Sequence, residues 1–414
     1  MSKKIESVAI IGGGPAGATL ASLLAMRGMN VTIFDDGKRP DLVVGESLIP
    51  AIVPVLRRLG IEERVAEIGL RKPGVSFVFG EAEEINFCFQ AVTKCGLPTY
   101  AYNVPRPAFD RVLEARATEL GAHRVPGRAR IERAGKDGLR LAPESLEQAP
   151  WLHGRHPDLL VDATGRARLF ARLLEIPSTT GPRKDVAYFA HYEGWEQEDP
   201  RGQVAIERLE AGWNWSIPLR DCLSCGVVMH RDDAAKLGAT AEERLEAAIE
   251  RDPVLRRKGA GRKRVSEVAT YTNYQLISTR GCGPGWTMSG DAFGFVDPML
   301  SPGMWLALHS GELLSERLDD LPGYDRLMRR HLQSWMEFIE YYYDGRMFAM
   351  YHSGMGWKRK YDLAISRTIH RYVEAHIACM ASGGTTSSTY SRGFIKFMAR
   401  HGIQGVDPGA LAIR

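Results

Sequence analysis

The chain has 414 residues, of which 44% are hydrophobic and 25% are charged, and its formal net charge is +4. This length exceeds one small core and predicts one large two-part domain or two domains. The composition is ordinary for a globular protein. The small net charge excludes a general nucleic-acid binder, whose binding face would be strongly basic. The six cysteines lack the density of a disulfide scaffold, so we expect a cytoplasmic protein.

An apolar run over residues 8–26 follows two lysines and superficially resembles a signal peptide. Its glycines lie where a tight turn between a strand and a helix needs them. We therefore interpret the run as part of the fold and not as a targeting segment. No other stretch is long and apolar enough to predict a membrane span, and we expect no membrane partner.

The chain opens with the pattern of a βαβ unit. Residues 7–11 and 30–34 are strand-like apolar runs on either side of a helical run over 15–28. Further helices are predicted over 51–59 and 109–120. A short buried strand is predicted to follow at residues 159–162.

From residue 185 to about 273 the pattern changes to short strand-like segments between polar turns, which is typical of a mostly antiparallel sheet. These segments cover residues 185–192, 203–209, 213–219 and 226–230. Residues 286–289 predict a return to the first sheet, and residues 303–318 predict a long helix. From residue 324 onward the pattern is mainly helical.

Together these elements predict an α/β fold of three parts. Residues 1–184 with 274–320 form a Rossmann-like dinucleotide-binding domain. Residues 185–273 form an inserted, mostly antiparallel sheet on the substrate side. Residues 321–414 form a helical C-terminal region.

The turn after the first strand reads Gly-Gly-Gly-Pro-Ala-Gly and matches the G-x-G-x-x-G pattern. Gly12 permits the tight turn, Gly14 lets the backbone approach a pyrophosphate, and Gly17 lets the helix pack closely on the sheet. The free N–H groups and positive dipole end of the helix favour phosphate. We expect the cofactor to contact Gly12, Gly14, Pro15, Ala16 and Gly17.

Acidic residues complete the nucleotide site. Asp35 closes the second strand, 23 residues after Gly12, where a ribose-binding carboxylate belongs, and Asp36 is the neighbouring alternative. Farther along the chain, Asp291 ends a predicted strand at a position that would reach the ribityl chain of a flavin. Residues 161–165 run from a strand into a turn, and this pair of distant segments favours FAD over NAD.

These motifs, with Arg106 in residues 104–110, resemble the FAD-dependent monooxygenase and halogenase superfamily over about residues 5–320. Three further segments are similar to the flavin-dependent halogenases. They are Gly-Glu-Ser-Leu-Ile-Pro at 45–50, Arg-Lys-Pro-Gly-Val-Ser-Phe at 71–77 and Gly-Trp-Asn-Trp-Ser-Ile-Pro at 212–218. The last resembles the W-x-W-x-I-P signature of that family.

The resemblance implies a division of chemical roles. In this family reduced FAD and O2 convert chloride or bromide to a hypohalous acid, which then attacks an electron-rich ring. Lys72 falls on the family's catalytic lysine and would present the hypohalous acid to the substrate. Trp213 and Trp215 share one face of a strand and would keep the organic substrate away from the flavin. Glu46 would be an acid near Lys72.

The resemblance also assigns the remaining cofactor contacts. They are Ser47, Arg106, Asp291, Pro298 and Gly303, with the halide at the N-terminus of the helix that begins near Gly303. The ordinary alternatives remain open: the two tryptophans as core aromatics and Lys72 as a surface lysine.

Two residues depart from the family pattern. Pro302 stands where relatives have a backbone N–H that helps to hold the halide, and proline has none. Either the halide moves to the Gly303 N–H or the chain has no halide site. Asp41 stands where many relatives have a basic residue.

We expect a separate flavin reductase to supply FADH2, because no second dinucleotide motif is visible. The acceptor would be a small electron-rich aromatic, such as a pyrrole, phenol or indole, either free or bound to a carrier protein. The six basic residues within 256–264 predict a solvated loop, or a contact with an acidic carrier. A flavin-dependent hydroxylase and a non-catalytic flavoprotein are the alternatives.

Other constellations predict structural roles. Cys222 and Cys225 are expected in a hairpin turn as free thiols, and no metal site is predicted. The histidines at 191, 230 and 309 are isolated in sequence and are expected to be structural. Tyrosines at 341–343 predict either a substrate cavity or helix packing.

Overall fold

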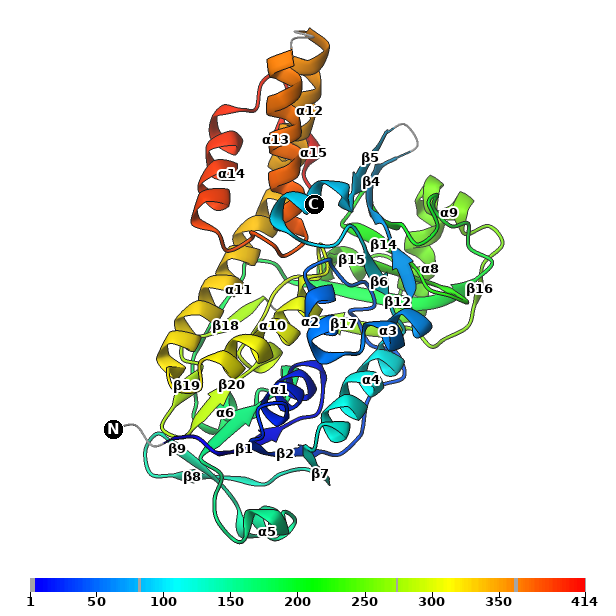
Figure 1. Cartoon of the computed structure of the whole chain (residues 1–414). Helices are drawn as coiled ribbons and strands as arrows, with labels where there is room; N and C mark the ends of the chain where they lie inside the picture. The colour runs from blue at the N-terminus through cyan, green and yellow to red at the C-terminus, as the bar shows by residue number, and fades with distance from the viewer. Residues whose placement is uncertain (1–3, 81–82, 273–274, 361–363, 414) are drawn as a thin grey trace.

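The computed structural model of the protein describes residues 4–80, 83–272, 275–360 and 364–413. The predicted domain boundary at residues 273 and 274 lies outside them. The predicted βαβ unit is present as β1 (Ser7–Ile11), α1 (Pro15–Ala25) and β2 (Asn30–Asp35). β1 pairs in parallel with β2 and with β10 (Leu159–Asp162), so the carboxyl ends of these strands meet at one edge (Figure 1).

This first sheet has six strands in the order β19-β20-β10-β1-β2-β7. Its edge strands are β7 (His123–Pro126) and β19 (Cys282–Gly283), and β20 (Trp286–Met288) lies between β19 and β10. α1 packs against both α4 (Arg106–Glu119) and α10 (Pro302–Glu316). The order places β1 and β10 side by side near the middle, where an open α/β sheet binds its ligand.

The second sheet has eight strands, and seven follow the order β16-β12-β15-β14-β13-β4-β5, while β17 also pairs with β12. The predicted segments are β12 (Asp185–Glu193), β13 (Val204–Arg208), β14 (Trp213–Pro218) and β15 (Leu223–His230). All pairs are antiparallel except β13 with β4, which run parallel. The remaining strands are β4 (Gly74–Phe79), β5 (Glu83–Cys88), β16 (Lys263–Arg264) and β17 (Ala269–Thr272).

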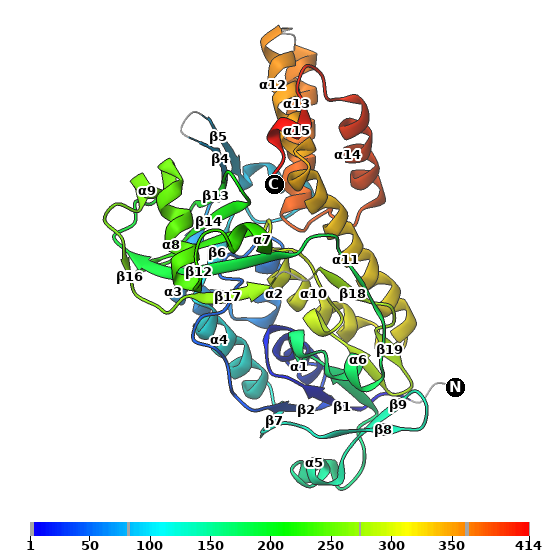
Figure 2. The same ribbon diagram turned by 180° about the vertical axis from the view of Figure 1, so that it is seen from behind.

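Alternation along β12 separates two cores. Ala187 and Phe189 join the main core, whereas Val186, Tyr188 and Ala190 join a smaller core on the opposite face. The smaller core is covered by α8 (Ala241–Arg251) and α9 (Pro253–Lys258), which Figure 2 shows against the far side of this sheet. The face toward the main core therefore remains available for the nucleotide-binding part.

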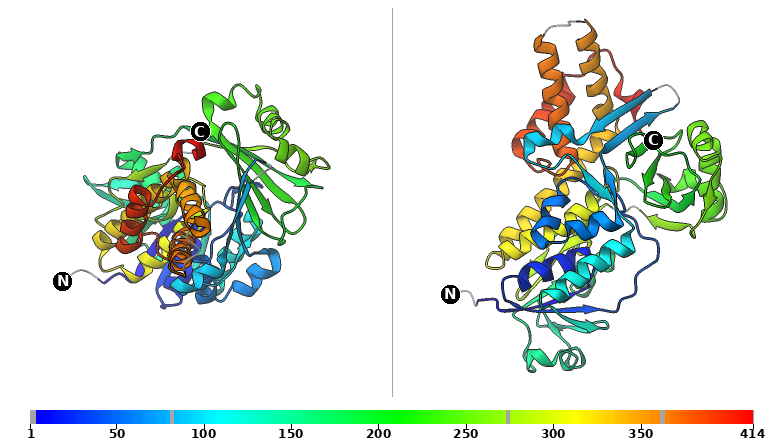
Figure 3. Two further views of the ribbon diagram at one scale, coloured as in Figure 1. Left: turned by 90° about the horizontal axis from the view of Figure 1, so that it is seen from above. Right: turned by 45° about the vertical axis from the view of Figure 1, so that its right-hand side comes forward.

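The C-terminal region is helical, as predicted. It comprises α11 (Leu321–Tyr343), α12 (Arg346–Lys360), α13 (Ala364–Ala381), α14 (Thr389–His401) and α15 (Pro408–Leu411). Figure 3 shows α12 and α13 extending from one end of the molecule, on the side of β4 and β5. α13 packs against the 3-10 helix η1 (Phe89–Cys95), so the far end of the chain closes over residues from its first quarter.

Shorter elements connect these parts. They are α2 (Ile52–Leu59), α3 (Glu62–Ile68), β3 (Leu70–Lys72), β6 (Ala101–Asn103), β8 (Ile131–Ala134), β9 (Gly138–Leu141), α5 (Pro143–Glu147), α6 (Leu169–Leu173), β11 (Ser178–Thr180), α7 (Arg231–Ala234), β18 (Leu276–Ser278) and β21 (Gly294–Phe295). The 3-10 turns are η2 (Pro150–Leu152), η3 (Gly165–Ala167) and η4 (Gly290–Ala292). Within the described residues, no helix combines the length and apolarity that crossing a bilayer requires.

Candidate functional site

A pocket of about 910 Å³ lies at the carboxyl edge of β1, β2 and β10. Its size is that of a site for a large cofactor. The predicted cofactor residues that line it are Gly12, Gly14, Pro15, Ala16, Asp35, Ser47, Arg106, Asp291, Pro298 and Gly303. The pocket thus gathers residues that are up to about 290 positions apart, and Gly17 alone among the predicted set lies behind it.

The glycine turn is shaped from both sides. Gly12 has φ +108°, and a Cβ there would come within 2.4 Å of the Ala163 carbonyl oxygen. A Cβ on Gly17 would lie 2.0 Å from the Gly12 carbonyl oxygen, so the helix can approach only because both residues are glycine. Gly14 differs, because a Cβ there would meet nothing within 4 Å. The space beside Gly14 is therefore open to a ligand.

The first N–H groups of α1 point to the same space. Gly14 is the N-cap residue and supplies no side-chain hydrogen bond, and Pro15 follows in the first turn. An uncapped helix N-terminus leaves donors and a positive dipole end for an anion. The turn therefore suits a pyrophosphate.

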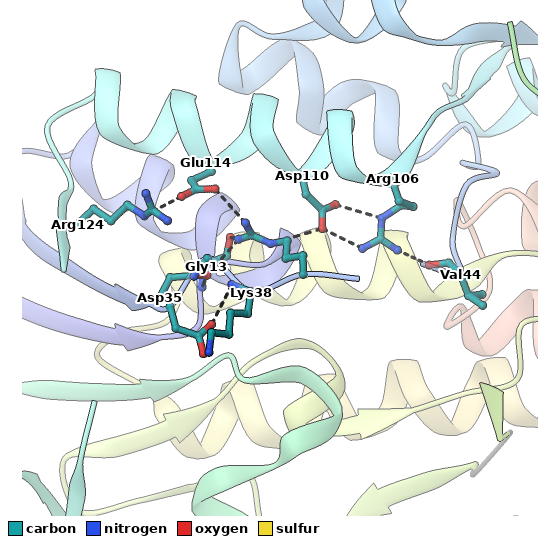
Figure 4. Close-up of polar contacts among 11 residues, drawn as sticks. Gly13, Asp35, Lys38, Val44, Arg106, Asp110, Glu114 and Arg124 are labelled. Carbon is teal, nitrogen blue, oxygen red and sulfur yellow. Dashed lines mark hydrogen bonds and ion pairs between the residues drawn. The ribbon is translucent and has the colours of Figure 1, made fainter. Parts of the chain in front are cut away.

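Asp35 lies against this turn and is held by a residue that the sequence analysis did not single out. Its carboxylate accepts from the backbone N–H groups of Gly13 and Gly37. The Arg39 guanidinium donates to the Asp35 carboxylate at 3.0 Å and to the Gly13 carbonyl at 2.8 Å. Arg39 lies two residues before Asp41, the position where many relatives have a basic residue. Figure 4 shows Asp35 beside Gly13.

Arg106 is buried and fixed at the opposite end of the same pocket wall. Its guanidinium donates to both carboxylate oxygens of Asp110, at 3.1 and 3.2 Å, and to the Val44 carbonyl oxygen (Figure 4). Both partners lie on the protein side, so the plane of the guanidinium is set before any ligand arrives. Gly45, at φ +105°, lets the chain pass directly over this group.

Asp291 faces the pocket from η4, and no described residue donates a hydrogen bond to its carboxylate. Burial raises the pKa of Asp291 to about 6, against the opposing influence of Arg166 and Arg106. Arg166 lines the pocket and follows the Gly165 turn. The sequence signal that could have found Arg166 is a basic residue four positions after the end of β10, a strand that ends at the site.

These features fit FAD. The open space beside Gly14 and the uncapped N-terminus of α1 would bind the pyrophosphate. The Asp291 carboxylate would bind the ribityl hydroxyls. Arginines at 39, 106, 128, 166 and 172 line the pocket and would balance a dianionic cofactor. The residues that line the pocket therefore fit an FAD molecule.

Lys72 does not line the FAD pocket. It is only 2% exposed, and its ammonium donates to the Ser47 hydroxyl at 2.8 Å and to the Leu48 carbonyl at 3.1 Å. Burial lowers the pKa of Lys72 to about 7, because the charged form is poorly solvated there. The interpretation as a surface lysine is thus wrong.

The Lys72 amine faces a separate cavity of about 40 Å³. The walls are mostly apolar and come from β4, η1 and α13, and they include Phe77, Phe89 and Ala378. Four residues line both this cavity and the FAD pocket: Val204, Ile206, Leu300 and Ser301. The lysine cavity and the FAD pocket are therefore neighbours that share one wall.

Trp213 and Trp215 lie on β14 and both line the FAD pocket, with ring centroids 5.9 Å apart. They are 2% and 6% exposed and also belong to the main core. The Trp215 indole donates to Ser224 at 3.3 Å, and the Trp213 indole donates to Tyr343 at 2.9 Å. Trp213 and Trp215 are therefore core aromatics and also part of the wall of the FAD pocket.

Glu46 lines the FAD pocket but pairs with His191 instead of Lys72, with Oε1 2.7 Å from Nε2. Burial opposes protonation of His191, but hydrogen bonds to Cys222 and Glu46 outweigh it and raise the pKa of His191 to about 10. His191 is thus isolated in sequence, as described above, but it has an acidic partner in the folded protein. No sequence spacing links 46, 191 and 222, since β12 and the turn before β15 meet only in the folded sheet.

Cys222 precedes β15, whereas Cys225 lies within the strand and is buried, so the predicted hairpin turn holds only the first cysteine. Both thiols are free. Cys225 is held in place by Asn214, whose amide nitrogen lies 3.2 Å from its sulfur.

The loop from Asp297 to Gly303 closes the pocket opposite the glycine turn. Leu300 and Ser301 adopt left-handed conformations, with φ 67° and 58°, which are unusual for residues with a side chain. Pro302 opens α10, where its lack of an N–H is tolerated. A Cβ on Gly303 would meet nothing within 4 Å, and Ser301 provides no side-chain cap. The Gly303 backbone is thus accessible to a small anion.

Comparison with known proteins agrees with this site. The family model described as an FAD binding domain matches residues 6–184. The fold and the site thus define a flavoprotein of the FAD-dependent oxidoreductase class. A tryptophan 2-halogenase of Chondromyces crocatus is 30% identical over 360 residues, which are 81% of this chain and 67% of that protein. The chain belongs to the flavin-dependent halogenase family.

Further relatives agree in sequence and in fold. The 1H-pyrrole-2-carbonyl-[peptidyl-carrier protein] chlorinase of Pseudomonas fluorescens is 27% identical, and the match covers 83% of this chain and 84% of that protein. Among solved structures, the myxobacterial chondrochloren halogenase covers 99% of both chains, with 24% identity and a TM-score of 0.71. A triple variant of a flavin-dependent brominase gives a TM-score of 0.76 at 21% identity, with 96% and 99% covered. The relatives favour halogenation over the hydroxylase and the non-catalytic flavoprotein.

Proposed function

We propose that this FAD-dependent halogenase uses FADH2 from a separate reductase to halogenate a small electron-rich aromatic or pyrrolic ring. The observation that carries the proposal is the buried Lys72 amine in a cavity that shares a wall with the FAD pocket. Bound reduced FAD would activate O2, and O2 would be the oxidant that converts the halide to hypohalous acid. We also propose that the enzyme acts in the cytoplasm, where free cysteines persist.

The residues around the two cavities would have different roles. Arg106 and Asp291 would orient the cofactor, and Trp213 and Trp215 would exclude the organic substrate from its side of the wall. The N–H of Gly303 would hold the halide, since Pro302 has none. Lys72 would receive the hypohalous acid and direct it to the acceptor in the second cavity.

Near neutral pH the Lys72 amine exists in both protonation states, because its pKa is about 7. The ammonium can donate a hydrogen bond to a hypohalous acid, and the neutral amine can accept the halogen. Ser47 holds the nitrogen in one place in either form, because a hydroxyl can accept from an ammonium or donate to an amine. The two protonation states and the fixed position of the nitrogen support the proposed role of Lys72 as the group that transfers the halogen to the acceptor.

A carrier-bound acceptor is supported by the pyrrole chlorinase and by a similarly named brominase of Pseudoalteromonas luteoviolacea, which is 28% identical over 323 residues. The lysine cavity, at about 40 Å³, is too small for a large free substrate. The basic segment at 256–264 gives this idea little support, since Arg257, Lys258 and Arg262 already pair with glutamates of the same chain.

The test combines product analysis with one substitution. Purified protein receives FADH2, O2 and bromide with free pyrrole, phenol and indole acceptors, and with the same rings as carrier-bound acyl thioesters. Mass spectrometry should find a monobrominated product. Lys72→Ala should lower its yield at least a hundredfold while FADH2 oxidation stays within about twofold. An oxygenated product that bromide does not change would contradict the proposal.

A further inference from the structure

The loop from Asp297 to Gly303 is held at its buried first residue by two side chains from distant parts of the chain. The Tyr343 hydroxyl donates to both carboxylate oxygens of Asp297, each at 3.0 Å. The Trp213 indole N–H donates to the same hydroxyl at 2.9 Å. Asp297 is fully buried, and the other two side chains are nearly so. Trp213, Tyr343 and Asp297 thus form one continuous hydrogen-bonded chain, which we call the Tyr343 tie.

The Asp297 carboxylate continues this chain into the loop itself. It accepts from the Met299 backbone N–H at 2.8 Å, and the Ser301 N–H donates to the Pro298 carbonyl at 2.8 Å. The two residues that follow Met299 are the left-handed Leu300 and Ser301. Such conformations persist only when surrounding contacts determine them. The Tyr343 tie reaches this loop from outside with two hydrogen bonds of 3.0 Å, and the Gln275 amide adds a longer one to Asp297 at 3.4 Å.

The geometry gives the tie a consequence for the site. Leu300 and Ser301 line both the FAD pocket and the lysine cavity, so their conformation shapes the shared wall. They also precede Gly303, the nearest backbone donor at the start of α10. Trp213, at the other end of the tie, lines the FAD pocket. One hydroxyl therefore fixes the loop and the tryptophan strand relative to each other.

Tyr343 itself is held firmly. The Arg183 guanidinium lies 3.8 Å from the centre of its ring and pairs with Asp185 at 2.5 Å. The Ile413 N–H donates to its carbonyl oxygen at 2.9 Å. Tyr343 is the last residue of α11, so the C-terminal helices reach the halide loop through this side chain.

We propose that Tyr343 is a positioning residue: through Asp297 it holds Leu300 and Ser301 in the conformation that forms the shared wall and exposes the Gly303 N–H to the halide. The neighbouring tyrosines do not share this role. Tyr342 lines the lysine cavity, and Tyr341 packs beneath Arg346, with no described residue accepting its hydroxyl. The halide part of the inference rests on the proposed function, whereas the loop part does not.

The first test measures the loop without any cofactor. Hydrogen exchange is followed by mass spectrometry on apo wild type, Tyr343→Phe and, as the matched control, Tyr341→Phe. Tyr343→Phe keeps the ring and removes only the hydroxyl. We expect peptides that contain the Met299, Leu300, Ser301 and Gly303 amides to exchange at least tenfold faster in Tyr343→Phe and unchanged in Tyr341→Phe. FAD affinity should stay within about threefold of wild type. Unchanged exchange in the loop would overturn the proposal.

The second test measures the halide. Tyr343→Phe should raise the bromide concentration at half-maximal product formation about tenfold, while the rate at saturating bromide stays within about threefold. A general loss of stability would instead raise exchange throughout the chain and lower FAD binding, and that result would assign Tyr343 a merely structural role. If wild type halogenates no acceptor, the proposed function fails, and the exchange measurement still decides whether Tyr343 positions the loop.

Discussion

At residue 72 the chain buries an amine whose hydrogen-bond partners, the Ser47 hydroxyl and the Leu48 carbonyl, are both neutral. In the folded protein its pKa falls from 10.5 to about 7. Between these pH values the unfolded chain binds one more proton than the folded chain. The free energy of unfolding therefore rises with pH across this window, and below about pH 7 the full penalty of burying the charge is present.

Replacement of this amine should make the penalty visible. We expect Lys72→Met to be more stable than wild type near pH 6 by a few kcal/mol, given about 1.4 kcal/mol per unit of pKa shift. The advantage should shrink toward pH 10, because the unfolded chain then comes close to losing its own proton and little of the penalty for burying the charge remains. Urea unfolding at pH 6, 8 and 10 measures the difference. A difference that is the same at all three pH values would contradict the low pKa.

The predictability of this residue from sequence was limited. Lys72 was found by resemblance to a motif, and nothing in its neighbours indicated burial, because the covering side chains come from η1 and α13, which are distant in sequence. Glu46 was assigned to the same lysine for the same reason. Its partner His191 lies 145 residues away and meets it only through the large sheet.

At the scale of elements, two glycines of the turn before α1 have different roles. Gly17 lets α1 pack closely on the turn, and Gly14 leaves room for the ligand. Gly14→Ala would place a methyl group in open space, so we expect unchanged thermal stability and a roughly tenfold loss of FAD affinity. Gly17→Ala would collide with the Gly12 carbonyl and should lower the free energy of unfolding by about 1–3 kcal/mol. Fluorescence titration and thermal melts separate the two effects. Equal effects on stability would argue against this assignment.

The start of α10 permits a gain of function. Pro302→Ala restores a backbone N–H beside Gly303 without altering the side chains of the pocket. We expect the bromide concentration at half-maximal product formation to fall severalfold, since a second donor joins the first. Pro253→Ala provides the control, because Pro253 occupies the same position at the start of α9. A variant with unchanged bromide dependence would show that the halide is not held at this end of α10.

Elements whose own residues show clear hydrophobic periodicity and turn signals could be predicted from the sequence. Elements without such a pattern could not. β1, α1 and β2 carry strong periodicity and punctuation, and their positions agree with the structure. β4 and β5 were not assigned, because the parallel pairing of β4 with β13 joins residues about 130 positions apart. Tertiary pairing of that kind leaves no mark on either segment alone.

At the scale of the whole molecule, one core runs through all three parts. It includes Val8 from the first sheet, Phe77 and Trp213 from the second, and Phe338 and Ile377 from the C-terminal helices. A continuous core of this kind favours cooperative unfolding. The domains that the sequence suggests therefore need not melt separately.

Calorimetry tests this expectation. Apo protein should unfold in one main transition, and FAD at a hundredfold excess over its Kd should raise the whole transition by a few degrees, since such an excess adds about 2.7 kcal/mol. The shift should be about half as large in Gly14→Ala at the same FAD concentration, which is then about tenfold above the variant's Kd and adds about 1.4 kcal/mol. Two resolved transitions, of which FAD moves only one, would show instead that the parts unfold independently.

The shared wall has a practical consequence for engineering. Val204, Ile206, Leu300 and Ser301 are the residues that face both chambers, and the rest of each lining belongs to one chamber alone. Under the proposed function, mutant libraries in β4, η1 and α13 should change acceptor choice, because these elements do not line the FAD pocket. Directed evolution should treat the four wall residues as the last positions to randomise.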